Sequence, residues 1–84
     1  MNMIYKTTDL TESILFKTFN YPYLGAEKVE TKAGKHSVEL TFDVPMVGTA
    51  EEMMKDYMNH ELQVDAYDFM EANKYIRREI YLKK

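Results

Sequence analysis

The sequence of 84 residues predicts a single small α+β domain that spans residues 1–84. Three observations lead to this fold class. Residues 36–43 alternate apolar and polar side chains, three other stretches place apolar residues at helical spacing, and no repeat, low-complexity tract or linker divides the chain. We expect the order β-α-β-β-α-β-α, with a central antiparallel hairpin packed by three helices.

The first elements expected are a short strand at residues 3–6 and a helix from about residue 10 to residue 19. Three side chains in front of the helix carry oxygens that can cap its N-terminus: Thr7, Thr8 and Asp9. The helix ends before Pro22, because the residue that precedes a proline resists helical geometry. Its apolar residues fall on more than one side: Leu10, Ile14, Leu15 and Phe16. We therefore expect this helix to be buried on more than one side.

The hairpin is expected from residues 23–30 and 36–43. The second arm has the period of a half-buried strand, and its inward side chains are Val38, Leu40 and Phe42. Gly34 in the connection is available for a positive φ, as tight hairpin turns require. The first arm alternates less cleanly, and we interpret Gly25 as the site of a β-bulge.

A second helix is expected after a loop at residues 44–48. Thr49 and Glu52 match a capping box, in which each side chain binds the backbone amide of the other residue. Apolar residues follow at helical spacing: Ala50, Met53, Met54, Tyr57 and Met58. We interpret these methionines as core residues rather than as an adaptable binding surface. Residues 61–64 are then predicted as a brief strand, with residues 3–6 as the neighbouring strand.

The last helix is expected from about Ala66 to Leu82, with Asp65 as its N-cap. Its predicted buried stripe consists of Phe69, Ala72, Ile76 and Ile80. A second group falls within about 60° of arc on the opposite side of the helix: Tyr67, Lys74, Arg78 and Tyr81. These residues are either ordinary exposed side chains, with Glu71 paired to Lys74, or a contact surface for a partner. Tyrosine and arginine are over-represented in interface hot spots, which favours the contact surface.

Short motifs along the chain resemble a family of small, uncharacterised proteins from bacteria and their phages. The motifs are Thr7-Thr8-Asp9-Leu10, Leu24-Gly25-Ala26-Glu27, Tyr57-Met58-Asn59, Val64-Asp65-Ala66 and Phe69. The resemblance runs from Tyr5 to Tyr81 and implies a bacterial or phage source. The family is a domain of unknown function, so the resemblance implies no activity. This chain departs from the family at His60, where the family has a glycine after the asparagine, and the departure leaves open how the turn is made.

Composition excludes several classes of protein. The chain has no cysteine, so it has no disulfide framework and no thiolate nucleophile, which favours a reducing compartment. No apolar run reaches the ~20 residues of a membrane-spanning helix, and the first residues have no signal-peptide pattern. We therefore expect a cytoplasmic protein that does not contact membranes.

Charge is distributed unevenly along the chain, whose formal net charge is −3. Residues 49–66 contain five acids and one lysine, for a net charge of −4, whereas residues 67–84 contain five bases and three acids, for a net charge of +2. Acids near helix starts and bases near a helix end are favoured by the helix dipole, which is the simplest interpretation. The alternative is a nucleic-acid interface in the last helix, formed by Lys74, Arg77, Arg78, Lys83 and Lys84. The acidic balance of the chain and the lack of a known reader motif count against it.

No combination of residues predicts catalysis or a metal site. His60, Glu61 and Asp56 are interpreted as a solvated helix end, because a metal site needs three or four convergent ligands. Ser37 follows His36 in a predicted strand, where neighbouring side chains point to opposite faces and are poorly placed to exchange a proton. We expect no enzyme activity, no cofactor and no bound metal.

These observations predict a non-enzymatic accessory protein, encoded by a phage or mobile element, that binds a protein partner. The predicted contact residues are Tyr67, Lys74, Arg78 and Tyr81. The partner is either a second copy of the chain or a host factor. Nucleic-acid binding through the same helix is the alternative, and it predicts a steep dependence of binding on salt concentration.

Overall fold

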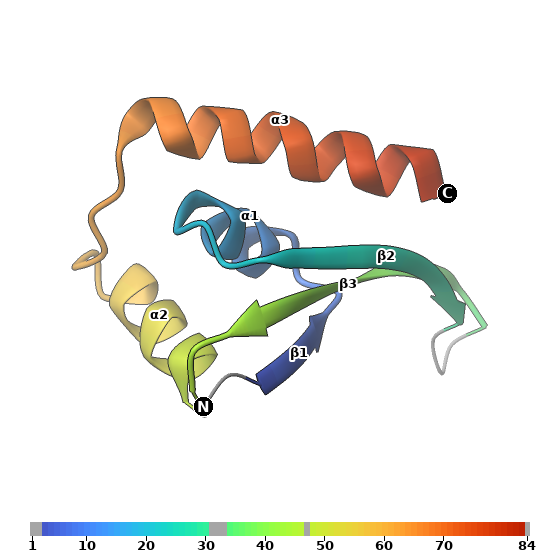
Figure 1. Ribbon diagram of the computed structural model, residues 1–84, viewed down its shortest axis with the longest axis horizontal. Helices are drawn as coiled ribbons and strands as arrows, with labels where there is room; N and C mark the ends of the chain where they lie inside the picture. The colour runs from blue at the N-terminus through green and yellow to red at the C-terminus, as the bar shows by residue number, and fades with distance from the viewer. Residues whose placement is uncertain (1–2, 31–33, 47, 84) are drawn as a thin grey trace.

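A computed structural model of the protein describes residues 3–30, 34–46 and 48–83. The elements follow one another as β1 (Met3–Thr7), α1 (Leu10–Thr18), β2 (Tyr23–Glu30), β3 (His36–Val44), α2 (Thr49–Met58) and α3 (Ala66–Lys83). The α+β fold class is therefore confirmed. Figure 1 shows α1 between the sheet and the long helix α3, while α2 lies at one end of the molecule.

The three strands form one antiparallel sheet in the order β1-β3-β2. The predicted hairpin is confirmed as β2 and β3, and the first strand is confirmed as β1. Tyr5 and Tyr23 both lie opposite Phe42 of the central strand, so the three side chains share the inner face of the sheet. The register shifts between Tyr23 and Gly25, where Gly25 has a φ of 133°, which confirms the predicted bulge.

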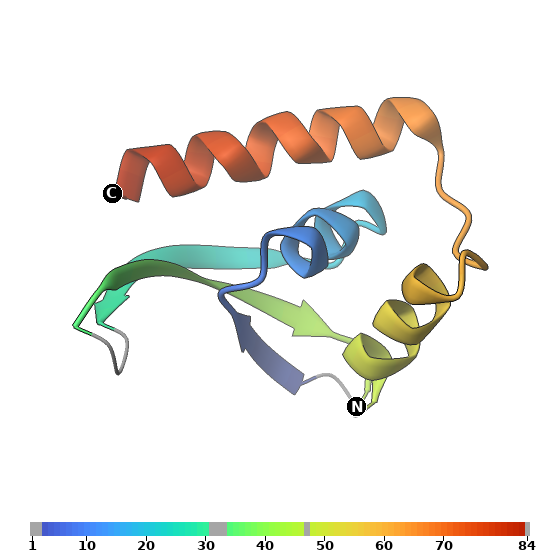
Figure 2. The ribbon, with the colours of Figure 1, turned by 180° about the vertical axis from the view of Figure 1, so that it is seen from behind.

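The predicted strand at residues 61–64 is wrong, and so is its pairing with residues 3–6. The structure shows no strand in residues 61–65, and β1 pairs with β3 instead. Figures 1 and 2 show the segment between α2 and α3 running along the end of the molecule, away from the sheet. Leu62 packs half-buried against the core while its neighbours Glu61 and Gln63 are exposed, so this segment is a linker held by one side chain and not a strand of the sheet.

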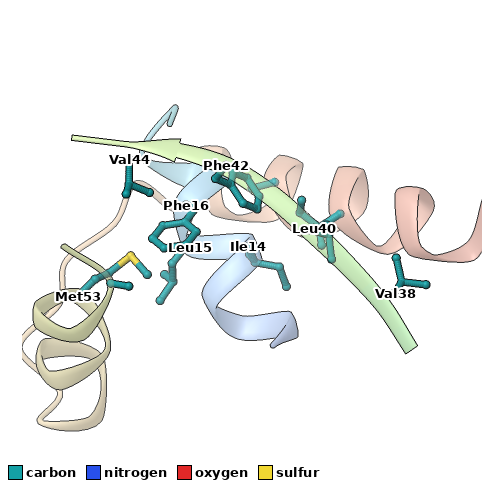
Figure 3. Packing of buried hydrophobic residues seen from close by; sticks show 11 residues of the cluster. Ile14, Leu15, Phe16, Val38, Leu40, Phe42, Val44 and Met53 are labelled. Carbon is teal, nitrogen blue, oxygen red and sulfur yellow. The ribbon is translucent and has the colours of Figure 1, made fainter. Parts of the chain in front are cut away.

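The core lies between the inner face of the sheet and the helices (Figure 3). β3 contributes its alternating side chains, which are Val38, Leu40, Phe42 and Val44, and all four are buried. The rings of Phe16 and Phe42 meet with centroids 5.2 Å apart, and Tyr5 packs edge-on against Phe16 with centroids 5.5 Å apart. Such aromatic contacts add to the stabilisation from buried apolar area.

Helix α1 is buried on more than one side, as expected, because it lies between the sheet and α3. Its small polar residues are buried too, and their hydroxyls bind the helix backbone: Ser13 Oγ donates to Asp9 O at 2.8 Å and Thr18 Oγ1 donates to Ile14 O at 2.7 Å. Of the three candidate capping residues, Asp9 is the N-cap, and its Oδ1 accepts from the Glu12 N–H at 2.8 Å.

The start of α2 differs from the prediction. Its N-cap is Gly48, with a φ of 90° and no side-chain cap, so the capping box of Thr49 and Glu52 does not form. The Thr49 hydroxyl donates backward to the Met46 carbonyl at 2.8 Å instead. Glycine adopts a positive φ at little cost, so Gly48 can serve as the N-cap. The helix therefore begins at Thr49, one residue earlier than it would with Thr49 as the N-cap.

The core interpretation of the α2 methionines is confirmed only for the first half of the helix. Ala50 and Met53 are buried and Met54 is half-buried, whereas Met58 is 73% exposed and Tyr57 is 45% exposed. The apolar stripe continues past the point where the core ends, because α2 projects beyond the sheet (Figure 1).

The turn after α2 places its left-handed residue at His60. Asn59 is the C-cap with a φ of −88°, and His60 follows with a φ of 61°. The left-handed conformation therefore falls on the residue where the resembling family has glycine, and not on Asn59.

Candidate protein-contact surface on α3

Helix α3 attaches to the domain through the stripe that the sequence predicts. Ala72 and Ile76 are buried, and Phe69 and Ile80 pack half-buried against the core. Tyr23 adds a polar tie, because its hydroxyl donates to Glu79 Oε1 at 2.9 Å. Asp65 caps the helix as predicted, and its Oδ1 accepts from the Asp68 N–H at 3.0 Å. These contacts hold one side of α3 in a fixed orientation.

The opposite side of α3 carries the predicted contact residues, which are Tyr67, Lys74, Arg78 and Tyr81; we call this surface the α3 outer face. All four side chains are exposed, with Tyr67 at 72% and Tyr81 at 78%. Figures 1 and 2 show α3 as an outermost layer, with no described helix or strand on its outer side. The helix presents these residues outward because the apolar stripe, on the other side, occupies the space against α1 and β2.

The charges of the outer face are free of ion pairs. Glu71 and Lys74 are both exposed, and within the described residues no ion pair joins the two side chains. The pairing of Glu71 with Lys74, which is part of the interpretation as ordinary exposed side chains, therefore does not form. Each of these side chains remains hydrated, so its charge is available to a partner at a small desolvation cost.

A groove of about 480 Å³ borders the outer face, between α3 and the end of α1. Lys17 and Asn20 line it on the α1 side, and Glu71, Lys74, Tyr75 and Arg78 line it on the α3 side. Lys17 Nζ lies 4.5 Å from the centroid of the Tyr75 ring, a cation–π arrangement. Sequence reasoning missed this groove, because no local pattern pairs a lysine of α1 with a tyrosine of α3. The groove extends the outer face toward α1 and adds charges of both signs.

The residues of the alternative nucleic-acid interface do not share one face. Lys74 and Arg78 lie on the outer face, but Arg77 points about 100° away from Arg78, and its Nε donates to Asn73 Oδ1. Lys83 lies about 140° from Arg78 around the helix axis. Lys84 falls outside the described residues. The bases that the structure describes are therefore spread around α3 and do not form a single stripe for phosphates.

The residues considered for chemistry are not brought together. Within residues 3–30, 34–46 and 48–83, no group of three or more histidine, aspartate or glutamate residues can hold a metal ion. His36 and Ser37 border a hollow of about 370 Å³, but their register partners in β2, Glu30 and Val29, lie on opposite faces of the sheet, and no hydrogen bond joins the two side chains. His36 and Ser37 are thus not arranged as a base and a nucleophile.

Two tyrosines on the inner face of the sheet have altered acidity. Burial, and then the hydrogen bond to Glu79, raise the pKa of Tyr23. Burial also raises the pKa of Tyr5, and the nearby Glu12 carboxylate adds to the effect. Both phenols therefore keep their protons and act as structural hydrogen-bond donors. The described structure gives Tyr67 and Tyr81 no hydrogen-bond partner.

No family model, curated protein or solved structure matches the chain. The resemblance to a family of uncharacterised bacterial and phage proteins therefore stays a prediction. None of the helices that the structure describes has the length and apolar character needed to cross a membrane.

Proposed function

We propose that this protein is a non-enzymatic accessory factor that binds another protein chain through the α3 outer face. The observation that carries the proposal is the exposure of Tyr67 and Tyr81, at 72% and 78%, with Lys74 and Arg78 between them. None of the four side chains has a hydrogen bond, ion pair or ring contact within the described residues.

The choice of side chains supports binding over simple solvation. A surface helix is as stable with lysine, glutamate or glutamine at these positions, and those residues leave no aromatic ring in water. Tyrosine offers a large, rigid and amphipathic contact area that loses little conformational entropy on binding, and arginine is the other residue enriched in hot spots. Two tyrosines about 21 Å apart along one helix face suit an extended contact with a helix or a flat surface.

The attachment of α3 to the domain also supports the proposal. Ile76 is fully buried, Tyr23 ties the helix to the sheet through Glu79, and Asp65 caps its first turn. A helix held in this way presents its outer side chains without a large ordering cost, which favours affinity. A phage or mobile-element origin, with a host factor or a second copy as the partner, belongs to the same proposal and is supported by the family resemblance alone.

Site-specific photo-crosslinking tests the proposal. A benzoylphenylalanine side chain replaces Tyr67 or Tyr81 in separate variants, and replaces Ile4 in a control, because Ile4 is 56% exposed on the sheet and remote from α3. We expect adducts of discrete mass from positions 67 and 81 in cell extract and none from position 4. Excess wild-type protein should compete for these adducts, and a variant with alanine at Tyr67, Lys74, Arg78 and Tyr81 should not. Equal labelling from all three positions would overturn the proposal.

Nucleic-acid binding is the second candidate, and the uncovered Lys74 and Arg78 beside two tyrosines are the observation that favours it. Titration of single-stranded DNA with the protein at low salt tests it. Binding that weakens steeply as salt is added would support this candidate. A flat titration would remove it and leave the crosslinking result unaffected.

A further inference from the structure

We infer that the chain bound by the α3 outer face is a second copy of this protein, with the two α3 helices packed antiparallel about a two-fold axis. The inference rests on the proposed function, because it names the partner of the same surface. Two properties of the outer face carry it: the spacing of its residues along the helix and the order of their charges.

The spacing suits a helix–helix contact. With Glu71 included, the outer stripe consists of Tyr67, Glu71, Lys74, Arg78 and Tyr81, and the steps between them are four, three, four and three residues. A repeat of 3.5 residues keeps side chains on one seam when two helices pack along their length. All five side chains are exposed, and no described element covers them.

The order of charges makes the stripe complementary to itself in only one orientation. Its acid, Glu71, comes before its bases, Lys74 and Arg78, along the helix. In an antiparallel pair, Glu71 of one copy meets Lys74 of the other, and Tyr67 meets Arg78. In a parallel pair, Lys74 would lie against Lys74 and Arg78 against Arg78, and such like-charge contacts oppose association.

A two-fold axis doubles each contact. The axis passes between residues 71 and 74, so the Glu71–Lys74 pair and the Tyr67–Arg78 contact each occur twice, as in isologous interfaces. The guanidinium group can stack on the tyrosine ring, which combines a cation–π interaction with apolar contact. Tyr81 of each copy then reaches toward the N-terminal end of the other α3.

The polarity of the stripe determines the expected strength of the pair. Exposed ion pairs are weak and are screened by salt, so we expect a weak, reversible dimer whose dissociation constant increases with ionic strength. A long apolar seam would instead give a permanent dimer that salt does not weaken.

Charge reversal with rescue tests the inference by sedimentation equilibrium of the full chain. Glu71→Lys and Lys74→Glu each replace two attractive pairs by two repulsive ones, and we expect each to raise the dissociation constant by about tenfold or more. The double variant restores both ion pairs with the charges exchanged. Its dissociation constant should lie within about threefold of the wild-type value. Glu52→Lys, on an exposed position of α2, serves as the control and should leave association unchanged.

Several outcomes would overturn the inference. The first is a wild-type protein that stays at the monomer mass of 10.0 kDa at every concentration. The second is a single charge reversal that leaves the dissociation constant unchanged. The third is a double variant whose dissociation constant is as high as that of the single variants. A monomeric wild type that still gives partner adducts from positions 67 and 81 would overturn the second copy as partner and leave the proposed function standing. A monomeric wild type without such adducts would remove both.

Discussion

The two sides of α3 differ in whether packing within the domain constrains the choice of amino acid at each position. On the inner side, Ile76 is fully buried and Ala72 leaves only 4% of its surface exposed, so size and shape are set by the packing around them. On the outer side, Tyr67 and Tyr81 expose more than two thirds of their surface and make no hydrogen bond or ring contact with the described residues. The fold requires the inner residues, but it does not require tyrosines on the outer side. Their presence therefore calls for an explanation outside the folding of the monomer.

The largest expected effect is a difference in unfolding free energy between a variant on the inner side of α3 and a variant on its outer side. Ile76→Ala should lower the free energy of unfolding by about 2–5 kcal/mol, because it leaves a cavity in a close-packed site. Tyr81→Ala should change it by less than about 0.5 kcal/mol, because alanine is the better helix former and no packing is lost. Urea unfolding followed by circular dichroism measures both. A similar loss for the two variants would mean that the outer side is part of the core.

A smaller effect on stability is expected from the hydrogen bond between Tyr23 and Glu79, which joins β2 to the inner side of α3. Tyr23→Phe removes the hydrogen bond to Glu79 and should cost about 1–2 kcal/mol, since the Glu79 carboxylate is left without its donor. Association should remain at the wild-type level, because the outer face is untouched. Denaturant unfolding and sedimentation of the same sample measure the two quantities. A loss of association in this variant would show that the inner and outer sides are not independent.

The same tyrosine makes stability depend on pH. Because the pKa of Tyr23 is raised in the folded protein, the folded state keeps a proton that the unfolded chain releases above its pKa of 10.0. The free energy of unfolding should therefore be constant with respect to this group below about pH 9 and should fall as the pH rises past 10. The free energy of unfolding should fall less steeply with pH in Tyr23→Phe. Some pH dependence remains in this variant, because the pKa of Tyr5 is raised as well. Equal slopes in the two proteins would contradict the buried donor role of Tyr23.

The smallest effect concerns the turn that leads from α2 toward α3. His60 adopts a φ of 61°, where a side chain is strained and glycine is not, so His60→Gly should raise the free energy of unfolding by up to about 1 kcal/mol. Asn59→Gly is the matched control and should give no gain, because Asn59 has a φ of −88°. Thermal unfolding of the pair measures the difference. Equal gains from both variants would mean that the left-handed residue is not specific to position 60.

Features that depend on local sequence were predictable. The alternation in β3, the caps at Asp9 and Asp65 and the bulge at Gly25 are each encoded within a few residues, and all four are present. The inner stripe of α3 was equally clear, because 3.6-residue periodicity is strong over 18 residues.

Features that depend on the extent of the core were not predictable. Met58 fits the apolar stripe of α2, yet the sheet ends before that helix does, and the side chain is 73% exposed. Residues 61–64 alternate like a strand, but β1 occupies the free edge of β3. The groove between α1 and α3 depends on a contact between Lys17 and Tyr75, which no local pattern encodes. The outer face was visible as a group of residues in the sequence, whereas the absence of ion pairs on it required the structure.

The central claim is that the outer side of α3 serves association and not folding, and one variant tests it most directly. Tyr67, Lys74, Arg78 and Tyr81 are all replaced by alanine, and the purified protein is measured for both unfolding free energy and association with its partner. We predict an unfolding free energy within about 1 kcal/mol of the wild type, because only exposed helix positions change, together with loss of association. A variant that associates as strongly as the wild type would contradict the claim.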